Sequence, residues 1–568
     1  MTLVGKLIQF VCWRAARRFD AATSDPVAVQ DAMLKDMMRR NAGTDYGRRY
    51  GFGSVGSFKD YQRQVPIVSF NDIAADIDRV VAGERNVLTA EDPVMFAQTS
   101  GTTGKPKLIP VVPSEEKGPH KDQMRSWIWH ASHDHPGLLD GKVVSLVSPA
   151  IEGHTERGLA YGSTSGHMYK NQPAIVRRTY CIPYDVFEIA DYIGKYYAIM
   201  RVGMEHDVRL VGTANPSSIM KLVEKADESS EALIRDIRDG TISNGVLIEP
   251  EIRKKLERLF RPNPTRAREL EELRRRRDGR LLPADYWPNL RLIGCWKGGT
   301  VGHYLDRFPL WFDPDGRKPQ PVRDWGYLAS EMRGSVPLSD QGSAGVLTIA
   351  ANLFEFAEMD SVLANPSDTS RWVCRTVGEI EQGKEYYVIV STTSGLYRYD
   401  INDVIRVEGR YRGTPEIVFL RKGRGMTNLT GEKVSVNQII EAHQQAADQA
   451  DVLVAHFRTE ADLANSRYVC RVEFAERVDD AHAQHFIAAL DRSLMGINIE
   501  YEAKRKSQRL GPPVLHIMRE GWYERGRQAQ VAEGKRAFQA KTEVLTPVKM
   551  ATQMVRPELD RVIEIEAP

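Results

Sequence analysis

Short apolar runs that alternate with helical segments constrain the fold of this chain more than any other feature of its sequence. Runs of this kind occupy residues 143–147, 208–212, 290–294 and 345–349. Each is short and rich in Val, Leu or Ile, which is typical of a buried strand. Because strands that alternate with helices form parallel sheets, the sequence predicts an α/β fold with substantial parallel sheet.

A basic segment with two glycines, Arg421-Lys422-Gly423-Arg424-Gly425, marks a domain boundary. Beyond it, the sequence predicts a helix from about Val436, strands within residues 451–457 and 467–474, and a further helix from Ala481. These elements make an α+β unit of ordinary domain size. We therefore predict a large N-terminal domain over residues 1–420 and a smaller α+β C-terminal domain over residues 421–568.

The charge balance and the cysteines exclude several classes of function. In 568 residues, 78 lysines and arginines nearly cancel 76 aspartates and glutamates, which leaves a formal charge of +2. A general nucleic-acid binder would show a basic excess, so we expect no nucleic-acid partner. The five cysteines are scattered and form no Cys-x-x-Cys pair. This pattern favours a reducing compartment over a disulfide or zinc framework, and we predict a cytoplasmic protein.

An apolar stretch over residues 3–13 is broken by two polar residues and followed by Arg14, Arg17 and Arg18. A secretory signal carries its positive charges before the apolar run rather than after it. No run of ~20 apolar residues occurs in the sequence, so we expect no integral membrane segment. An amphipathic helix packed on the body of the protein is favoured over a helix that lies on a membrane surface.

A loop rich in glycine, serine, threonine and lysine is the strongest local signal for chemistry. It comprises Thr99, Ser100, Gly101, Thr102, Thr103, Gly104, Lys105, Pro106 and Lys107. Small residues let backbone amides converge on phosphate oxygens, while hydroxyl groups and lysines add donors and positive charge. The loop closely follows residues 94–97, a predicted strand, and so occupies the place where α/β sheets bind ligands. Its glycine spacing and the proline after the first lysine exclude a Walker loop. Phosphate binding is favoured over a flexible turn.

This loop resembles the nucleotide-phosphate loop of adenylate-forming enzymes, the superfamily of acyl-CoA synthetases, luciferases and peptide-synthetase adenylation domains. Two later segments extend the resemblance. Residues 327–331, Tyr-Leu-Ala-Ser-Glu, are similar to the superfamily's Tyr-Gly-x-(Ser/Thr)-Glu segment. Residues 399–403, Tyr-Asp-Ile-Asn-Asp, are similar to its Tyr-Arg-x-Gly-Asp segment.

One branch resembles this chain best, the Gretchen Hagen (auxin-responsive) family of acyl acid amido synthetases. Its third segment reads approximately Gly-Leu-Tyr-Arg-Tyr-Arg-Val-Gly-Asp-Val, and residues 395–404 here read Gly-Leu-Tyr-Arg-Tyr-Asp-Ile-Asn-Asp-Val. Asp400 thus replaces an arginine, and Asn402 replaces a glycine. The order and spacing of the segments agree from about Val68 to Thr546. Each segment alone is a weak signal, but three in order before a basic glycine hinge are specific.

The resemblance implies roles for several residues in ATP binding. Asp403 would accept hydrogen bonds from the ribose hydroxyls, and Glu331 would hold Mg²⁺ against the phosphates. Ser330 and Tyr327 would lie beside AMP, with the tyrosine ring as a stacking face for adenine. Gly299 would belong to the backbone wall of the adenine and acyl pocket. Without the resemblance, Asp403 would be interpreted as a surface carboxylate and Glu331 as part of a structural ion pair. Tyr327 would be interpreted as a core aromatic residue, and Gly299 as part of an ordinary turn.

A lysine from a mobile C-terminal domain completes the implied site. The family's segment there resembles Gln-Tyr-Lys-x-Pro-Arg, and residues 539–544 here read Gln-Ala-Lys-Thr-Glu-Val. Lys541 would stabilise the charge that develops on phosphate and carboxylate oxygens in the transition state. Lys535 is a competing candidate, and either lysine can be an ordinary surface residue. Arg421 would mark the hinge, because the glycines beside it can absorb large backbone changes.

The implied reaction has two steps and uses ATP and Mg²⁺. A carboxylic acid attacks the α-phosphate of ATP, and pyrophosphate leaves. The acyl-adenylate then reacts with an amine, expected to be that of an amino acid, to give an amide and AMP. An acyl-CoA ligase, with a thiol as the acceptor, is one alternative. A nucleotide-binding homologue that lacks catalysis is another, suggested by the missing Pro-Arg pair and by Asn402.

Two other patterns support neither a metal site nor serine hydrolysis. His130, His133 and His135 match no standard zinc spacing and precede a Pro-Gly turn, so ordinary surface histidines are favoured over a metal site. Residues 162–166 read Gly-Ser-Thr-Ser-Gly, with threonine where a serine hydrolase carries its nucleophile.

Overall fold

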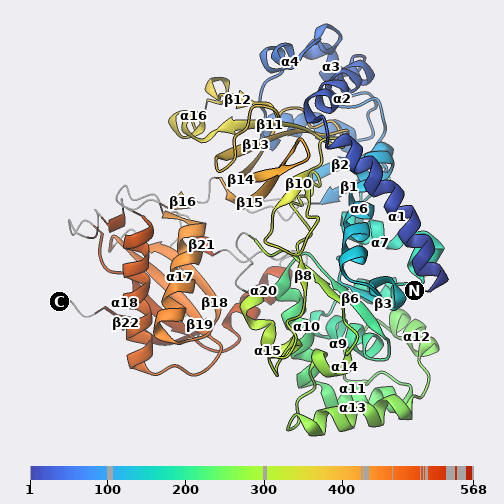
Figure 1. The fold of residues 1–568 in the computed structure, drawn as a ribbon, viewed down its shortest axis with the longest axis vertical. Helices are drawn as coiled ribbons and strands as arrows, with labels where there is room; N and C mark the ends of the chain where they lie inside the picture. Colours follow the sequence, from blue (N-terminus) through green and yellow to red (C-terminus); the bar gives the residue numbers. More distant parts are fainter. Residues whose placement is uncertain are drawn as a thin grey trace. The chain divides into compact units, whose positions relative to one another are not determined.

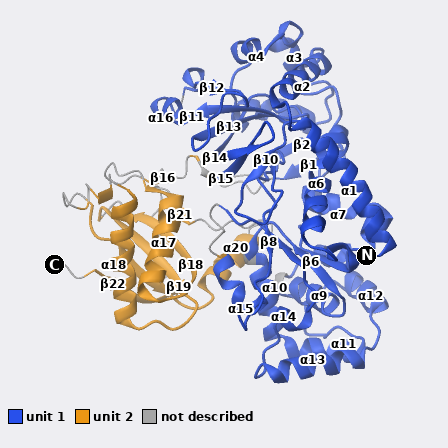
Figure 2. Cartoon of the chain, in the orientation of Figure 1, with its two compact units in different colours: residues 1–298, 305–419 blue, residues 299–304, 420–568 orange. Residues whose placement is uncertain are grey.

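The chain forms two compact units, which carry different colours in Figure 2. The first comprises residues 1–298 and 305–419, and the second comprises residues 299–304 and 420–568. The computed structural model describes residues 2–98, 107–298, 304–366, 368–423, 426–427, 434–462, 465–498, 501–502, 505, 510–532, 544–546 and 558–565.

A parallel sheet of four strands organises one part of the first unit (Figure 1). Its strands, in spatial order, are β3 (Lys142–Ser145), β6 (Val208–Gly212), β7 (Leu292–Gly294) and β8 (Val322–Arg323). Every neighbouring pair is parallel. Three of the predicted apolar runs therefore lie in this sheet, and the predicted α/β fold is confirmed. β7 is buried along its whole length, as expected for a strand covered on both faces.

Helices connect and surround these strands. They are α6 (Gly118–Asp134), α7 (Thr164–Lys170), α8 (Ala174–Arg177), α9 (Tyr192–Gly203), α10 (Pro216–Glu228), α11 (Ser230–Asp239), α12 (Pro250–Leu259), α13 (Pro264–Arg276), α14 (Pro283–Tyr286) and α15 (Pro309–Phe312). Several begin with proline in the first turn, where the missing N–H has no helical partner to lose. In α13 the side chain of Asn263 also caps the helix by accepting from the backbone N of Arg266.

A second, antiparallel sheet contains the fourth predicted apolar run. Its order is β12-β11-β13-β14-β15-β10-β9. The strands are β9 (Ser335–Val336), β10 (Gly345–Leu347), β11 (Leu353–Glu358), β12 (Cys374–Arg375), β13 (Glu385–Ser391), β14 (Tyr399–Tyr411) and β15 (Thr414–Lys422), with α16 (Met359–Ala364) after β11. β10 pairs antiparallel with both β9 and β15. The run at 345–349 is thus a strand, as predicted, but it belongs to this antiparallel sheet and not to the parallel one.

The N-terminal helices share a core with the antiparallel sheet. These helices are α2 (Pro26–Asn41), α3 (Asp45–Arg49), α4 (Phe58–Gln64) and α5 (Phe70–Val81). The preceding helix, α1 (Leu3–Ala22), contributes Phe19 to a different core cluster, which includes Trp127. A small sheet, β2 (Leu108–Val111), β1 (Met95–Gln98), β5 (Ala160–Gly162) and β4 (Gly153–His154), joins the same core. Leu34, Ile77, Phe96, Phe354 and Ile405 represent its different elements, and all are at most 2% exposed.

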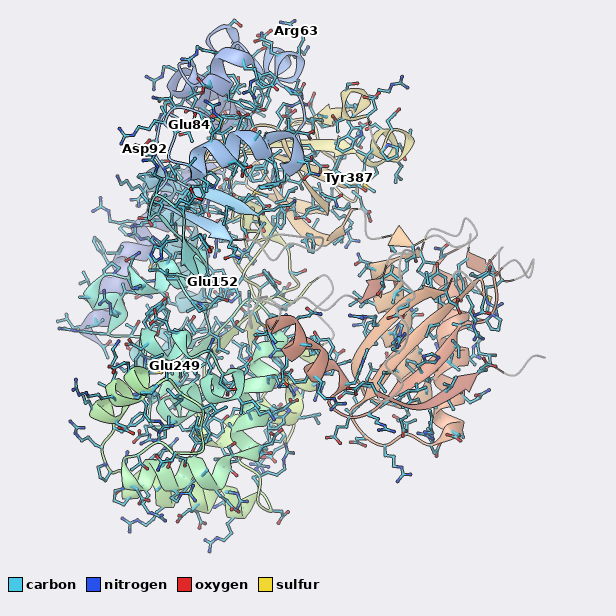
Figure 3. The ribbon with its side chains drawn as sticks, turned by 180° about the vertical axis from the view of Figure 1, so that it is seen from behind. Arg63, Glu84, Asp92, Glu152, Glu249 and Tyr387 are labelled. Carbon is cyan, nitrogen blue, oxygen red and sulfur yellow. The ribbon has the colours of Figure 1, made fainter. Side chains whose placement is uncertain are left out.

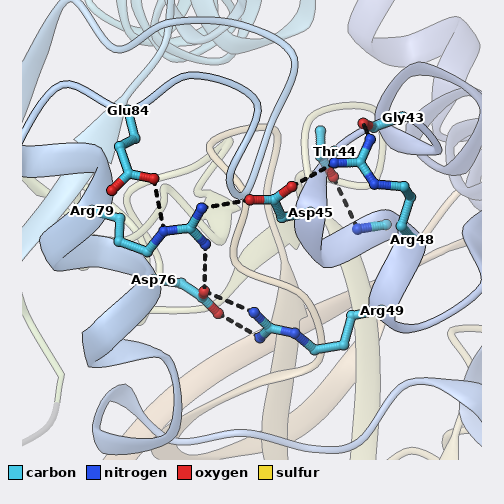
Figure 4. A network of polar contacts seen from close by, with 9 residues as sticks. Gly43, Thr44, Asp45, Arg48, Arg49, Asp76, Arg79 and Glu84 are labelled. Atoms are coloured by element: carbon cyan, nitrogen blue, oxygen red, sulfur yellow. Dashed lines mark hydrogen bonds and ion pairs between the residues drawn. The ribbon is translucent and has the colours of Figure 1, made fainter.

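An ion-pair network links α3 to α5 at the surface of the first unit (Figure 4). Arg79 contacts Asp45 at 2.5 Å and Glu84 at 2.9 Å, and Arg49 contacts Asp76 at 2.7 Å. Figure 3 shows Glu84 from behind, on the same outer part of the unit as Arg63 and Asp92. The Arg49 and Arg79 side chains are 45% and 37% exposed, and ion pairs at such partly exposed positions contribute little individually. We therefore assign the network to local geometry rather than to a site.

The N-terminal helix packs on the body of the first unit, as the sequence predicts. Its buried side is formed by Gly5, Cys12, Ala15, Ala16 and Phe19, and it contacts α6. No helix in the described part of the chain is long and apolar enough to cross a membrane.

The second unit is an α+β body with a five-stranded sheet in the order β21-β18-β19-β20-β22. Its elements are β16 (Met426–Thr427), β17 (Val434–Ser435), α17 (Val436–Ala450), β18 (Val454–Asp462), β19 (Arg467–Phe474), α18 (Asp480–Ile497), β20 (Val514–Met518), α20 (Trp522–Ala532), β21 (Leu545–Thr546) and β22 (Leu559–Glu564). A capping box between Ser435 and Gln438 begins α17. α17 and α18 pack together and share a core with β18 and β19. Within this unit the Tyr304 hydroxyl lies 2.9 Å from Nδ1 of His456.

Candidate active site

The carboxyl ends of the parallel strands form the framework of the candidate site. Because β3, β6, β7 and β8 are parallel, the segments that follow them leave the sheet at one edge, where open α/β sheets bind ligands. Buried polar residues occur in these segments, including Thr213 and Asn215 after β6 and Asp324 after β8. This edge carries Tyr327, which begins the second segment of the family resemblance.

Asp324 ties two of these segments together. Its Oδ2 accepts a hydrogen bond from the backbone N of Lys297 at 2.6 Å, and its Oδ1 accepts one from the backbone N of Gly326 at 2.5 Å. Burial raises the pKa of this carboxyl group to about 6, although the backbone amides act in the opposite direction. The segment after β7 is therefore fixed to the turn that leads into Tyr327. Sequence reasoning missed Asp324, because it follows a strand of only two residues and belongs to no recognised motif.

Tryptophan rings pack against the strand ends. The Trp325 ring lies 4.1 Å from the Trp127 ring, and its Nε1 donates to the carbonyl oxygen of Thr213 at 3.0 Å. A Cβ atom added to Gly294 would lie 2.6 Å from the Trp325 ring, and one added to Gly212 would lie 3.1 Å from it. The indole therefore occupies the space that a side chain at position 294 would need, and it leaves little room for one at position 212.

Tyr327 and Asp403, predicted from two separate segments, contact each other directly. The Tyr327 hydroxyl donates to Oδ2 of Asp403 at 2.6 Å, and the two residues are 6% and 2% exposed. The Tyr327 ring also stacks on Phe419, with centroids 5.6 Å apart. The structure therefore joins the predicted adenine-side tyrosine and the predicted ribose-side carboxylate into one buried unit.

Ser330 and Glu331 lie at the tip of a tight turn that follows Tyr327. The backbone N of Ala329 donates to the carbonyl oxygen of Met332 at 2.8 Å, which closes the turn, and both tip residues are half-buried. Burial, and then the negative charge of Glu331, Asp400 and Asp403, raises the pKa of Tyr399. Glu331 therefore lies near the third segment, as its predicted role beside the nucleotide requires.

The residues present fit a magnesium ion that ATP would bring with it. Mg²⁺ prefers oxygen ligands and is usually held by one or two carboxylates, substrate phosphates and water. Glu331 supplies such a carboxylate beside the third segment. Within the described ranges, no three His, Cys, Asp or Glu side chains form a closed metal site. A carboxylate of this kind suits an ion that is shared with phosphates.

A buried arginine supports the start of the third segment. The Arg398 guanidinium donates to both carboxylate oxygens of Glu355, at 2.9 and 3.0 Å. It also donates to the carbonyl oxygens of Gln62 and Val65, at 2.9 and 2.8 Å. The Arg398 and Glu355 side chains are 7% and 2% exposed. A cation that bridges α4 and β11 therefore positions the chain just before Asp403.

The replacement of glycine by Asn402 fits the local backbone. Asn402 has a φ of 55°, in the left-handed region that glycine adopts readily and asparagine tolerates better than most residues. Its backbone N donates to Oδ1 of Asp400 at 2.8 Å, so both departures from the family segment lie in one irregular stretch of β14, where its register with β13 shifts. Asparagine therefore suits the left-handed backbone directly before Asp403.

We expect Asn402→Gly to leave stability nearly unchanged and Asn402→Ala to destabilise the protein. The left-handed conformation costs an alanine residue about 1–2 kcal/mol, because its Cβ approaches the following carbonyl oxygen. Glycine has no Cβ and avoids this cost. Urea unfolding of the two variants beside the parent would measure the difference. Equal midpoints for the alanine and glycine variants would show that the backbone at this position does not determine the choice of residue.

Several predicted site residues lie outside the described part of the chain. They are Thr99, Ser100, Gly101, Thr102, Thr103, Gly104, Lys105, Gly299 and Lys541, together with the side chain of Arg421. Lys107 is described and half-buried, with its ammonium group 4.8 Å from the centroid of the Phe70 ring. The loop that ends there connects β1 to its antiparallel partner β2, and neither strand belongs to the parallel sheet.

Two of the three histidines that the sequence analysis considered, His133 and His135, contact neighbouring side chains. Nε2 of His135 lies 2.7 Å from Oδ2 of Asp340, and Arg323 contacts the same carboxylate. The His133 ring stacks on Trp129. His135 is not the surface residue that the sequence suggested, because its side chain is only 13% exposed.

The fold defines the class of the protein. A solved 2-hydroxyisobutyryl-CoA ligase, captured in its postadenylation state, aligns with a TM-score of 0.52 at 12% identity over 93% of this chain and 91% of that one. A solved GH3.15 acyl acid amido synthetase aligns with a TM-score of 0.82 at 21% identity over 96% of both chains. The chain thus has the fold of the adenylate-forming enzymes.

Comparison of sequences identifies the family within this class. Residues 15–315, 345–422 and 436–548 match the GH3 family N-terminal, central and C-terminal domains. A jasmonoyl–L-amino acid synthetase, JAR6 of Nicotiana attenuata, is 26% identical over 93% of this chain and 92% of its own length. This chain belongs to the GH3, or Gretchen Hagen, family of acyl acid amido synthetases, which confirms the resemblance seen in the sequence.

Proposed function

We propose that this protein activates a carboxylic acid with ATP and transfers the acyl group to the amine of an amino acid. The observation that carries the proposal is the buried contact between Tyr327 and Asp403. It joins two segments to which the family resemblance assigns nucleotide binding, and the first of them follows β8 of the parallel sheet. The family relationship and the jasmonoyl–L-amino acid synthetase relative support the same chemistry.

Different residues would bind different parts of ATP. Asp403 would hold the ribose, and Tyr327 and Ser330 would lie beside the adenine and the α-phosphate. Lys105, Lys107 and the hydroxyl and amide groups of the loop at 99–104 would bind the phosphate chain. Glu331 would hold Mg²⁺, which lowers the cost of charge on the phosphates when it is bound.

Two steps complete the proposed reaction. An oxygen of the substrate carboxylate attacks the α-phosphorus of ATP, the bond to the β-phosphate oxygen breaks, and pyrophosphate leaves. The amine nitrogen then attacks the acyl carbon, AMP leaves with the bonding electrons, and the nitrogen gives up a proton. Gly299 would line the pocket, and Lys541 would offset charge in the first step. Arg421 would mark the hinge between the domains at 1–420 and 421–568.

An ATP–pyrophosphate exchange screen over carboxylic acids, followed by mass spectrometry of products made with amino acids or with CoA, tests the function. We expect exchange with at least one acid and an amide as the product. A CoA thioester in place of the amide would establish the acyl-CoA ligase alternative. Nucleotide binding without exchange for any acid would establish the non-catalytic alternative.

We expect Asp403→Ala to weaken the use of ATP without loss of the fold. Two ribose hydroxyls would lose a charged acceptor, at a cost of about 1.5–3 kcal/mol, or roughly 10- to 150-fold in affinity. Titration of ATP into the purified variant measures the change.

Tyr327→Phe is the matched control for this prediction. It removes the hydroxyl that donates to Asp403 but leaves the carboxylate and the stacking ring in place. Equal losses in the two variants would show that Asp403 acts only as the partner of Tyr327 and does not bind the ribose.

We also propose that the protein resides in the cytoplasm. All five cysteines are free thiols, and burial raises the pKa of Cys12 and of Cys470 to about 12, which keeps both thiols protonated. Thiols of this kind suit a reducing compartment. Localisation of the tagged full chain by microscopy or fractionation would test the assignment.

A further inference from the structure

The N-terminal helix α1 has two faces of different character. The buried face packs on the body of the first unit, and the helix lies at the outer edge of that unit (Figure 1). Leu3, Leu7 and Phe10 project from the opposite face and are 85%, 50% and 53% exposed. Their spacing of four and three residues places them in one line along the helix. Val11 lies beside this line and is 41% exposed.

The same outward face carries positive charge without negative charge. Arg14 and Arg17 continue the line of exposed residues by helical spacing, and Lys6 flanks it. The segment from Leu3 to Phe19 contains no aspartate or glutamate. The nearby carboxylate of Asp122 is already bonded to Arg18, at 2.7 Å.

Aromatic rings occupy the transition between the apolar and the basic turns. The Phe10 and Trp13 rings lie 5.8 Å apart, and the Arg17 guanidinium lies 5.3 Å from the centroid of the Trp13 ring. Indole rings and long basic side chains are favoured at the boundary between lipid headgroups and acyl chains, because each has an apolar body and a polar end.

We propose that the outward face of α1 is a docking surface for an anionic lipid bilayer, which the protein contacts peripherally. Leu3, Leu7 and Phe10 would enter the acyl boundary, and Lys6, Arg14 and Arg17 would bind the headgroup charge. Charge complementarity selects this occupant over a second copy of the chain. A symmetric contact through this face would bring the same unpaired cations against each other. The inference does not depend on the proposed function.

Co-sedimentation of the full-length protein with vesicles tests the docking surface. Phosphatidylcholine vesicles with and without phosphatidylglycerol are compared at low and high salt. We expect binding to the vesicles that contain phosphatidylglycerol, weaker binding to phosphatidylcholine alone, and release by salt. Absence of binding to the anionic vesicles at low salt would overturn the proposal.

Two sets of substitutions separate the apolar and the basic contributions. Leu3→Ser with Leu7→Ser and Phe10→Ser should weaken vesicle binding at least about tenfold, because three apolar side chains no longer leave water. Arg14→Gln with Arg17→Gln should weaken it about fivefold for each charge removed. Unchanged binding of either variant would overturn the proposal.

Matched control variants replace exposed leucines by serine and exposed arginines by glutamine at positions outside α1. Leu247→Ser with Leu259→Ser and Leu310→Ser removes apolar side chains that are 68%, 60% and 48% exposed, and should leave vesicle binding unchanged. Arg39→Gln with Arg63→Gln removes two exposed cations and should also have no effect. Circular dichroism and thermal unfolding verify the fold of each variant.

Light scattering tests whether a second copy of the chain, rather than lipid, covers this face. The parent protein should have the same mass as the Leu3→Ser, Leu7→Ser, Phe10→Ser variant in the absence of lipid. A parent dimer that this variant converts to a monomer would assign the face to a second copy of the chain and overturn the lipid proposal.

Discussion

Alanine in place of Lys541 is expected to remove most ATP–pyrophosphate exchange while sparing amide synthesis from a supplied acyl-adenylate. The ammonium group would stabilise charge that develops only as the α-phosphate is attacked. The loss of such a donor typically costs about 10²–10³ in rate. Exchange assays and amination of a pre-made acyl-adenylate, run on the same preparation, measure the two steps separately.

Lys535→Ala is the control for this assignment, because Lys535 lies near Lys541 in sequence and carries the same charge. Full exchange activity in the Lys541 variant, with loss in the Lys535 variant, would transfer the role to Lys535. Equal loss in both assays would mean that Lys541 serves both steps or has a structural role. A loss confined to the exchange assay would support a C-terminal domain that turns between the steps.

The Arg398→Met variant is expected to lose more stability than any other variant considered for this protein. Methionine keeps an unbranched apolar side chain similar to the stem of Arg398, but it has no positive charge. The Glu355 carboxylate would therefore stay buried without its cation. Removal of one partner from a buried ion pair typically costs about 3–5 kcal/mol. Urea unfolding followed by circular dichroism would show a shifted midpoint for the transition of the first unit.

The double variant Arg398→Met, Glu355→Gln provides the internal control. It removes the unpaired charge as well and should recover part of the lost stability. If the single and double variants unfold at the same midpoint, the cost arises from the contacts of Arg398 with the carbonyl oxygens of Gln62 and Val65. If Arg398→Met unfolds with the parent, the pair does not stabilise the fold.

The sequence was informative where local pattern determines structure. The runs at 143–147, 208–212 and 290–294 form parallel strands because their apolar residues are buried between covering helices. The run at 345–349 has the same composition, yet it contributes an antiparallel strand. Pairing direction depends on partners distant in sequence, so no local pattern could reveal it.

In the candidate site, too, local motifs predicted some residues, whereas others depend on contacts between distant parts of the chain. Tyr327, Glu331 and Asp403 could be named from ordered segments, and the contact between Tyr327 and Asp403 brings two of those segments together. Asp324 and Trp325 could not be named, because they follow a strand of two residues and match no motif. Their importance appears only when hydrogen bonds and ring contacts connect them to the segments after β6 and β7.

The long-range contacts of Arg398 have a consequence for synthesis of the protein on the ribosome. Arg398 and Val65 are separated by 333 positions, and Gln30 bonds to Asn352 across 322 positions. At a translation rate of about 5–20 residues per second, roughly 20–70 s pass between the emergence of the two ends of such a contact. During that interval α2, α5 and β1 lack the sheet that covers their apolar side chains. The nascent first half of this enzyme should therefore depend on chaperones until β14 has left the exit tunnel.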